Sequence, residues 1–427
     1  MPNHPNTVLF SEWRGLNNKS PSERIAENFL TEATNIDIDA AGSIRMRRGY
    51  TQQIAGTDAH SLWSDGDKEA YYVESGTLYR IDPNDTTKRT SITTGLSDSR
   101  LSYIKIDGKV YFNNIRGDSG VIENNTVRSW GLDTPRISPF LSVISGQLTA
   151  GDYSVAVRYR DVNGRVSGTG PQGLITVPSD NSGLLVSGLE TPADASVTHV
   201  ELFISTPNGE VLYYHSSVPS GTSSTTVTSL YGNMVPLEYQ FVFPAPPGEM
   251  MQLYNGRIYM AYENRLWYSE PHAYEHFNWA GWIEFHEDIT NIMPVDDGIF
   301  ITADQLYFLE GREPTTFNMR EREIYKAAKY TGVAIVGGDI LMENIPTGLK
   351  WLFTSNKGIV MLGTGGLVFN LTERNVMVAN AEEGAAIFKS KDGMNQYVSL
   401  LKNPNEQRMH FGDSATADVI RNGILIT

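Results

Sequence analysis

Residues 254–268, which read YNGRIYMAYENRLWY, contain two short runs of apolar and aromatic residues, each preceded by a tight turn. Asn255-Gly256 leads the first run, and Glu263-Asn264 separates it from the second. Asn-Gly beside alternating apolar residues is a strong signal for a β-hairpin. Aromatic residues also favour the pleated surface of a strand over a helix. The stretch therefore predicts a buried strand, a tight turn and an aromatic strand.

The same unit of turn, strand, turn and aromatic strand recurs along the chain, at residues 69–81, 103–112, 296–309 and 356–369. The hairpins are roughly 40–60 residues apart, which suits the four-stranded blades of a β-propeller. The stretches 48–131 and 246–427 together are long enough for about six blades at roughly 40–45 residues each. We therefore predict a β-propeller of about six blades.

The middle of the chain, residues 132–245, does not follow this repeated hairpin pattern. It is rich in Ser, Thr, Gly and Val, and it is bordered by Pro135 and Pro244. Residues 151–159 alternate cleanly, turn at Asn163-Gly164 and lead into further short strands. About seven strands in roughly 110 residues is the size of a β-sandwich of the immunoglobulin or fibronectin type III kind. We predict one such sandwich, inserted between two blades.

The first 47 residues differ from both patterns. Ser20, Pro21 and Glu23 have the spacing of a helix start, with a capping residue, a proline in the first turn and an acid three positions on. A short helix is expected over roughly residues 21–33, followed by an alternating strand over 33–39. The prediction as a whole is an all-β chain in four segments: an N-terminal arm with one helix (1–47), a first propeller segment (48–131), the inserted sandwich (132–245) and a second propeller segment (246–427).

Composition limits the classes of function. The chain has 427 residues, a net charge of −15 and no cysteine, which excludes disulfides, zinc–thiolate sites and cysteine nucleophiles. Such an acidic chain is not expected to bind DNA by neutralising phosphates, because that mode needs clustered Lys and Arg. No run of 18 apolar residues and no signal pattern at Met1 is present. We expect synthesis in a host cytoplasm and no membrane partner.

Three stretches together resemble bacteriophage tail proteins of the hub or nozzle type: the N-terminal stretches 13–18, 33–39 and 47–50, the middle domain from residue 151 onward, and residues 254–271. The resemblance implies a structural protein of the virion tail that forms a homo-oligomeric ring, with a hexamer as one option. It also implies neighbouring tail adaptor or portal-side proteins and tail fibres as partners. Genomic DNA would then pass through the ring without tight binding, since an acidic wall repels it.

Histidine and aspartate pairs are the candidates for chemistry. His272 and His276 are four residues apart and could bind a metal on a helix, but Pro271 and the aromatic neighbours favour a packed loop. Asp296 and Asp297 lack the spacing of a calcium loop and are more typical of a turn. We therefore expect no enzyme activity, no catalytic residue, no cofactor and no metal.

Two groups of residues remain as interaction candidates. Arg45, Arg47 and Arg48 form the only dense positive run; it is either a solvated strand edge or a docking contact with an acidic neighbouring ring. In the alternative function, a glycan-binding or glycan-cleaving tail receptor, an aromatic rim of Trp267, Trp279 and Trp282 would stack on sugars. A third alternative is a bacterial surface adhesin, which the missing signal pattern disfavours.

Overall fold

The computed structural model describes residues 12–39, 41–47, 49, 51–230, 234–322, 325–335, 348–378, 381–391, 394–402 and 424–425. Within these ranges the chain is all-β, which confirms the predicted class. The helical turns there are three 3₁₀ turns of three residues each: η1 (Ser22–Arg24), η2 (Pro314–Thr316) and η3 (Thr364–Gly366). Every pairing between the named strands of the six blades and the sandwich is antiparallel.

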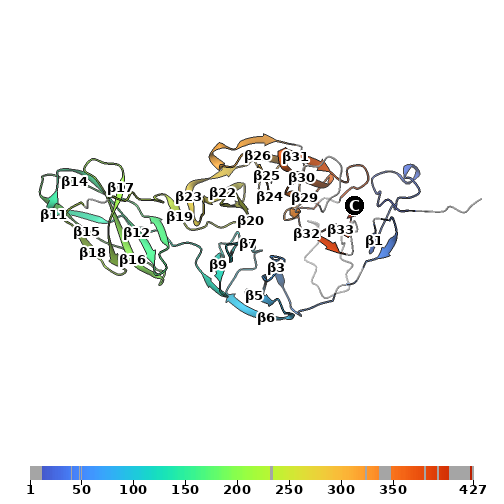
Figure 1. The fold of residues 1–427 in the computed structure, drawn as a ribbon, viewed down its shortest axis with the longest axis horizontal. Coiled ribbons are helices and arrows are strands. Elements are labelled where there is room, and N and C mark those ends of the chain that lie inside the picture. The colour runs from blue at the N-terminus through green and yellow to red at the C-terminus, as the bar shows by residue number, and fades with distance from the viewer. Residues whose placement is uncertain are drawn as a thin grey trace, which may run out of the picture.

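Six small sheets form the blades of a β-propeller, arranged around a common axis in Figure 1. Blade 1 contains β3 (Ala59–Ser64), β4 (Ala70–Glu74), β5 (Thr77–Asp82) and β6 (Asp85–Thr94). Blade 2 contains β7 (Ser102–Ile106), β8 (Lys109–Asn113), β9 (Gly120–Glu123) and β10 (Thr126–Arg128). Blade 3 contains β19 (Val242–Phe243), β20 (Glu249–Tyr254), β21 (Arg257–Tyr262), β22 (Arg265–Glu270) and β23 (Ala273–Glu284).

The remaining blades follow in chain order. Blade 4 contains β24 (Asn291–Val295), β25 (Gly298–Thr302), β26 (Leu306–Glu310) and β27 (Asn318–Glu321). Blade 5 contains β28 (Val333–Ile335), β29 (Lys350–Ser355), β30 (Gly358–Gly363) and β31 (Leu367–Asn370). Blade 6 contains β32 (Glu383–Lys391), β33 (Met394–Lys402) and β34 (Ile424–Leu425). The hairpin predicted at residues 254–268 is the centre of blade 3.

The apolar cores lie between successive blades, because the two faces of each blade pack against its two neighbours. Five clusters of buried side chains join blades 1 and 2, 2 and 3, 3 and 4, 4 and 5, and 5 and 6. Contacts between blades run through their inner strands, with β20 beside β7 and β24, and β28 beside β32. In blade 3 the innermost strand is β20, because β19 pairs with β23 at the opposite edge of the sheet. Residues that begin an inner strand therefore lie near the axis.

The inserted segment forms two sheets over one core. The smaller sheet has the order β11 (Phe140–Leu148), β15 (Ser182–Ser187), β18 (Ser224–Val227). The larger sheet contains β12 (Gly151–Asp161), β13 (Val166–Thr169), β14 (Gly173–Val177), β16 (Val197–Ser205) and β17 (Leu212–Pro219). Side chains from both sheets, such as Tyr153, Leu184 and Leu202, share one buried cluster. The segment is a β-sandwich, and its assignment to the fibronectin type III kind stays a prediction.

The helix predicted in the N-terminal arm is not found in the structure. Residues 21–33 do not form a helix; only the turn η1 is present, and it has no side-chain cap. The Leu30 N–H donates to Gly15 O (2.9 Å), and the Asn17 N–H donates to Leu30 O (2.8 Å). This bridge removes Leu30 from any helix, and the few residues left before it are too short for a stable one. A two-stranded sheet follows, β1 (Ile36–Ile38) with β2 (Ile44–Met46).

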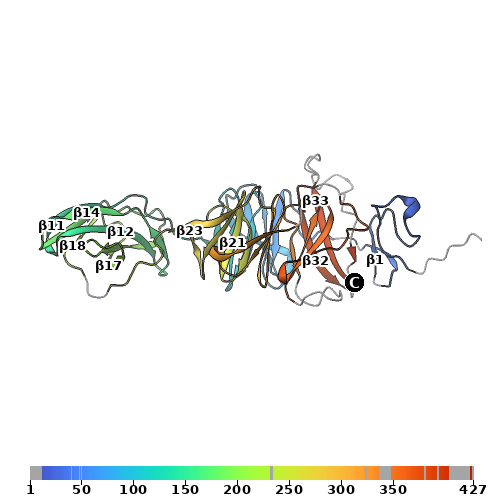
Figure 2. The ribbon, with the colours of Figure 1, turned by 90° about the horizontal axis from the view of Figure 1, so that it is seen from above.

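The three bodies lie in a row. Figures 1 and 2 show the sandwich and the arm on opposite sides of the propeller rim, with the sandwich joined beside blade 3 and the arm near blades 5 and 6. The arm is held there by Asn18, whose amide donates to Met377 O (3.1 Å) and accepts from Met377 N–H (2.8 Å). Lys19 Nζ also donates to Glu373 O. The chain is therefore elongated, with the long direction in the plane of the propeller.

The sandwich contains a buried histidine that makes its stability depend on pH. His215 on β17 donates from Nε2 to Ser229 O (3.1 Å), and burial lowers the pKa of His215 below its ordinary value of 6.5. A depressed histidine pKa contributes stability that is complete above pH 6.5 and is lost as pH falls through the folded-state pKa. We expect the melting temperature to fall more between pH 7.5 and 5 in the wild type than in His215→Gln. Parallel pH curves for the two proteins would contradict this.

Candidate functional site

The predicted tryptophans gather on one surface of blade 3, which we call the aromatic shelf and define by Phe241, Phe243, Trp267, Trp279 and Trp282. Trp267 and Trp282 are cross-strand partners on β22 and β23, with ring centroids 6.4 Å apart. Phe243 stacks on Trp279 at 4.2 Å with an interplanar angle of 24°, and it meets Trp267 edge-on at 5.7 Å. The structure thus brings the three predicted tryptophans together. It adds Phe243 on β19 and the preceding Phe241, whose backbone carbonyl accepts a hydrogen bond from the Trp279 N–H.

A bulge in β23 exposes Trp279. The register of β22 with β23 shifts between the pairs Trp267–Trp282 and Ser269–Phe277, so β23 carries extra residues there. The Ala280 N–H donates to Asn278 Oδ1 (3.0 Å), which turns the backbone outward. As a result Trp279 is 64% exposed, and Phe241 beside it is 62% exposed. Bulges commonly re-aim a side chain in this way next to functional surfaces.

Charged side chains border the shelf. The guanidinium carbon of Arg265 lies 4.4 Å from the ring centroid of Trp282. Arg265 Nη2 is also 3.6 Å from Glu284 Oε1, and both side chains are about half exposed, at 44% and 50%. Cation–π contact holds the guanidinium over the ring. The shelf is therefore a small aromatic surface with hydrogen-bonding groups at its edge.

The arginines predicted for docking lie on the arm. Arg45 on β2 forms an ion pair with Asp39 (2.7 Å) but keeps 64% of its side chain exposed. Arg47 is nearly buried at 10% exposure and is paired with Asp37 (3.2 Å). Arg48 lies outside the described residues. Of the two arginines that can be placed, only Arg45 presents its charge to solvent, and the docking role stays a prediction.

A charged network crosses the propeller axis. Glu249 begins β20 in blade 3 and is 3% exposed; its carboxylate is paired with Lys329 Nζ and accepts a hydrogen bond from the Tyr330 hydroxyl. Lys329 and Tyr330 precede the first strand of blade 5, which is not a neighbour of blade 3. Arg100, which precedes blade 2, lies with its guanidinium carbon 4.0 Å from the centroid of the Tyr330 ring. Its Nη1 donates to Gly384 O (3.1 Å) in blade 6. We call these four side chains, Glu249, Lys329, Tyr330 and Arg100, the axial network.

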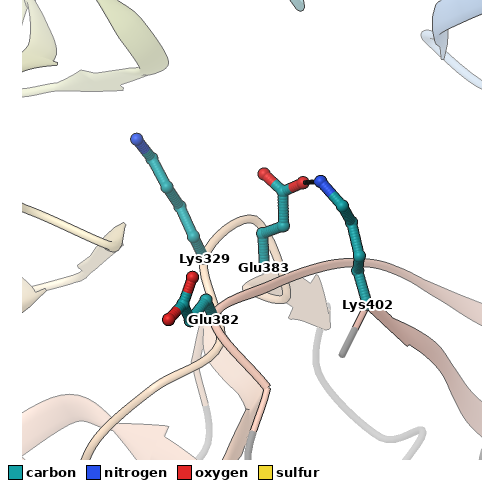
Figure 3. A pocket seen from close by; sticks show the side chains of 4 residues that line it. All are labelled: Lys329, Glu382, Glu383 and Lys402. Atoms are coloured by element: carbon teal, nitrogen blue, oxygen red, sulfur yellow. Dashed lines mark hydrogen bonds and ion pairs between the residues drawn. The ribbon is translucent and has the colours of Figure 1, made fainter. Parts of the chain in front are cut away.

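Burial shifts the pKa values of two members of the axial network, Tyr330 and Arg100. Burial, and then the adjacent Glu249 carboxylate, raise the pKa of Tyr330 above its ordinary value. Desolvation lowers the pKa of Arg100, although an arginine stays charged throughout the physiological range. A cavity of about 350 Å³ beside the network is lined by Lys329, Glu382, Glu383 and Lys402. Figure 3 shows Glu383 paired with Lys402 and the Lys329 side chain extending separately.

The sandwich is fixed to the propeller by a second polar cluster. Glu275 on β23 accepts from Arg128 Nη2 (2.6 Å) in blade 2 and from Arg165 Nη1 (3.2 Å) in the sandwich. Arg165 Nε also donates to the fully buried carboxylate of Asp161 (2.8 Å). Nearby, His276 Nε2 donates to Val166 O (2.8 Å). These bonds join three elements that are far apart in sequence, so they orient the sandwich on the rim.

The structure shows where the two candidate metal-binding histidines, His272 and His276, lie. His276 is used at the sandwich junction, and β23 is a strand, so His272 and His276 do not share a helix face. No group of three or more His, Asp or Glu that could hold a metal occurs in the part of the chain that the structure describes. Over the same part, no helix is long and apolar enough to cross a membrane. The expectations of no enzyme activity and no cofactor stay predictions.

Sequence reasoning missed the axial network and the junction cluster. Glu249 and Tyr330 are 81 residues apart, and Arg128 and Glu275 are 147 apart. No local spacing signals such pairs.

The fold therefore defines a six-bladed β-propeller with an inserted β-sandwich and an N-terminal arm. No protein-family model matches the sequence, and no curated protein matches it. Among solved structures, a streptogramin B lyase is similar at 10% identity with a TM-score of 0.30, over 80% of this chain and 90% of that chain. A structure of BBS1N in complex with ARL6DN is similar at 11% identity with a TM-score of 0.32, over 83% and 92%. The N-terminal domain of Nup159 is similar at 10% identity with a TM-score of 0.27, over 80% and 72%.

Proposed function

We propose that this chain is a structural component of a bacteriophage virion tail, a hub- or nozzle-type subunit that assembles with its own copies into a ring. The observation that carries the proposal is the placement of two firmly held appendages on opposite sides of one propeller rim. The resemblance of the N-terminal stretches and of residues 254–271 to tail proteins of this type supports it. In this role the chain acts mechanically, and its partners are its copies, adjoining tail proteins and fibres.

Ring geometry explains why two appendages matter. A closed ring of identical subunits uses a head-to-tail contact, in which two different surfaces of each subunit meet. The arm and the sandwich are different surfaces separated by the width of the propeller. Their hydrogen bonds to the propeller, through Asn18 at one end and Glu275 at the other, fix the angle between the two contacts. A fixed angle is what allows a ring to close instead of growing into a filament.

The charge of the chain fits a DNA conduit between subunits. The axial network occupies the centre of each propeller, so the bore for DNA would be the space that the ring encloses. With a net charge of −15, an acidic wall repels a polyanion and lets it slide without adhesion. We expect no measurable DNA binding by the purified protein at physiological salt in a fluorescence polarisation assay. Tight, salt-sensitive binding would contradict the repulsive wall.

Substitutions of arginines on the N-terminal arm test whether the arm docks a neighbouring subunit. Copies with this net charge repel one another, so assembly needs specific contacts. Arg45, which is 64% exposed, belongs to the arginine run predicted to meet an acidic neighbour, and Arg48 is a further member of that run in the sequence. Each exposed pair contributes only about 0.2–1 kcal/mol, but the contact repeats around a closed ring. We expect Arg45→Glu with Arg48→Glu to leave the subunit folded and to abolish ring assembly or incorporation into virions. The matched control is Arg14→Glu, an exposed arginine on the same arm.

Imaging tests the proposal as a whole. Negative-stain images of the purified protein at high concentration should show rings whose subunits have the elongated outline of Figure 1. Peptide mass spectrometry of purified phage particles should detect the chain as a virion component. A chain that stays monomeric at all concentrations and is absent from particles would refute the proposal. Normal rings formed by the double arginine variant would remove only the docking role of the arm.

A further inference from the structure

We propose that the aromatic shelf on blade 3 is a carbohydrate-binding site, with Trp279 as the platform on which a pyranose ring stacks. The inference goes beyond the tail-component proposal, because a ring subunit does not need a sugar site. It rests on three observations about the shelf: how Trp279 is held, which of its faces is free, and how small the apolar area is.

The backbone fixes Trp279 in its exposed position. Its N–H donates to Phe241 O (3.3 Å), and its carbonyl accepts from Trp282 Nε1 (3.2 Å). The Asn278 turn sets the bulge from the other side. A large aromatic side chain gains free energy from burial, so a rigid bulge that holds it 64% exposed indicates a contact surface. A platform that is already rigid also loses little conformational entropy when a ligand binds.

One face of the indole is free. Phe243 covers the other face at 4.2 Å with nearly parallel rings, so the exposed area is a flat aromatic surface. The C–H groups on one face of a pyranose form an apolar patch that fits such a surface, while its hydroxyls point outward from the ring edge. Arg265 and Glu284, which are about half exposed at the border of the shelf, can donate to and accept from those hydroxyls. The shelf therefore offers an aromatic surface to the C–H face of a sugar and hydrogen-bonding groups to its hydroxyls.

The size of the shelf separates a sugar from a protein partner. The strongly exposed members are Phe241 and Trp279, and an aromatic side chain buries only about 150–250 Å². A stable protein interface buries about 800 Å² on each partner. The neighbours Arg265, Glu284 and Ala280 extend the surface with polar or small groups and not with further aromatic area. One or two sugar rings cover the shelf, whereas a protein would need contacts that it does not offer.

The test uses an array of bacterial surface polysaccharides and their oligosaccharides, probed with the full chain. We expect the wild type to bind at least one glycan, and Trp279→Ala to weaken that binding about tenfold or more, since an aromatic stacking contact is of this size. Trp279→Phe should retain part of the affinity, because it keeps an aromatic face. Phe140→Ala, which removes an aromatic side chain that is 67% exposed on the sandwich, should bind like the wild type.

Two results would overturn the inference: no glycan bound by the wild type, or equal binding by wild type and Trp279→Ala. The melting temperature of each variant checks that the fold is intact. Ring formation in negative stain is scored on the same preparations. Rings without glycan binding would reject the sugar site alone. Glycan binding by a chain that forms no rings and is absent from phage particles would reject the tail-subunit proposal alone.

Discussion

Gly168→Val is expected to detach the sandwich from the propeller. Gly168 lies on β13, and a Cβ atom there would be 1.9 Å from the carbonyl oxygen of Val242 on β19. Because the obstructing atom belongs to the backbone, it cannot move aside as the end of a side chain can. Overpacking of this severity destabilises a contact by several kcal/mol, about 3 or more. The hydrogen bonds of Glu275 and His276 across the junction would be lost with it.

We expect Gly168→Val to give a folded chain in which the sandwich has no fixed orientation relative to the propeller. The sandwich has its own buried core, and the propeller has separate ones between its blades, so each body should remain folded. Small-angle scattering should show a broader distribution of distances, and limited proteolysis should cut near residues 134 and 240. The matched control is Gly49→Ala, where a Cβ meets nothing within 4 Å. A variant as compact and protease-resistant as the wild type would show that this contact does not fix the sandwich.

The same contact explains how the insertion is accommodated. Gly168 also approaches Thr134, so the two connections between sandwich and propeller lie against one glycine. Insertions are tolerated where the two ends of the inserted body are close together. One boundary shifts from the prediction, since Val242 and Phe243 pair with β23 and are part of blade 3. Replacing residues 135–240 with a short Gly-Ser linker should therefore leave a folded propeller, and an aggregated product would count against the insertion.

Local sequence signals predicted the hairpins well, for a physical reason. Two-residue turns of type I′ need positive φ at both central positions, and Asn255-Gly256 and Asp107-Gly108 both show it. The sequence placed Trp267 and Trp282 on one aromatic rim, and the structure shows that they are cross-strand partners. Periodicity cannot report contacts between distant segments, so Phe243 under Trp279 was not predicted. The helix predicted in the arm is absent because a backbone bridge to Leu16 holds Leu30 in an extended conformation. The spacing of residues within 21–33 carries no information about that bridge.

The second large effect is expected at the propeller axis, where the carboxylate of Glu249 is almost fully buried. Removing one partner of a buried ion pair leaves the other charge uncompensated, which costs about 3–5 kcal/mol. We therefore expect Glu249→Ala to lower the free energy of unfolding of the propeller by about 3 kcal/mol, since Lys329 keeps some contact with solvent. Thermal and urea unfolding of the full chain measure it. Lys88→Met, in the exposed pair with Asp85, is the control, with a loss of about 0.5 kcal/mol or less.

A double-mutant cycle separates the ion pair from simple loss of packing. Glu249→Gln with Lys329→Met removes both charges while nearly keeping the volumes, and the glutamine oxygen can still accept from the Tyr330 hydroxyl. Replacing a buried pair by groups of similar shape is often close to neutral, so the double variant should recover most of the stability that either single variant loses. Additive losses would mean that Glu249 and Lys329 are not coupled across the axis. In that case the Glu249–Lys329 pair would not hold blades 3 and 5 together across the axis, and the connection of Glu249 to blade 5 within the axial network would rest on the hydrogen bond from the Tyr330 hydroxyl.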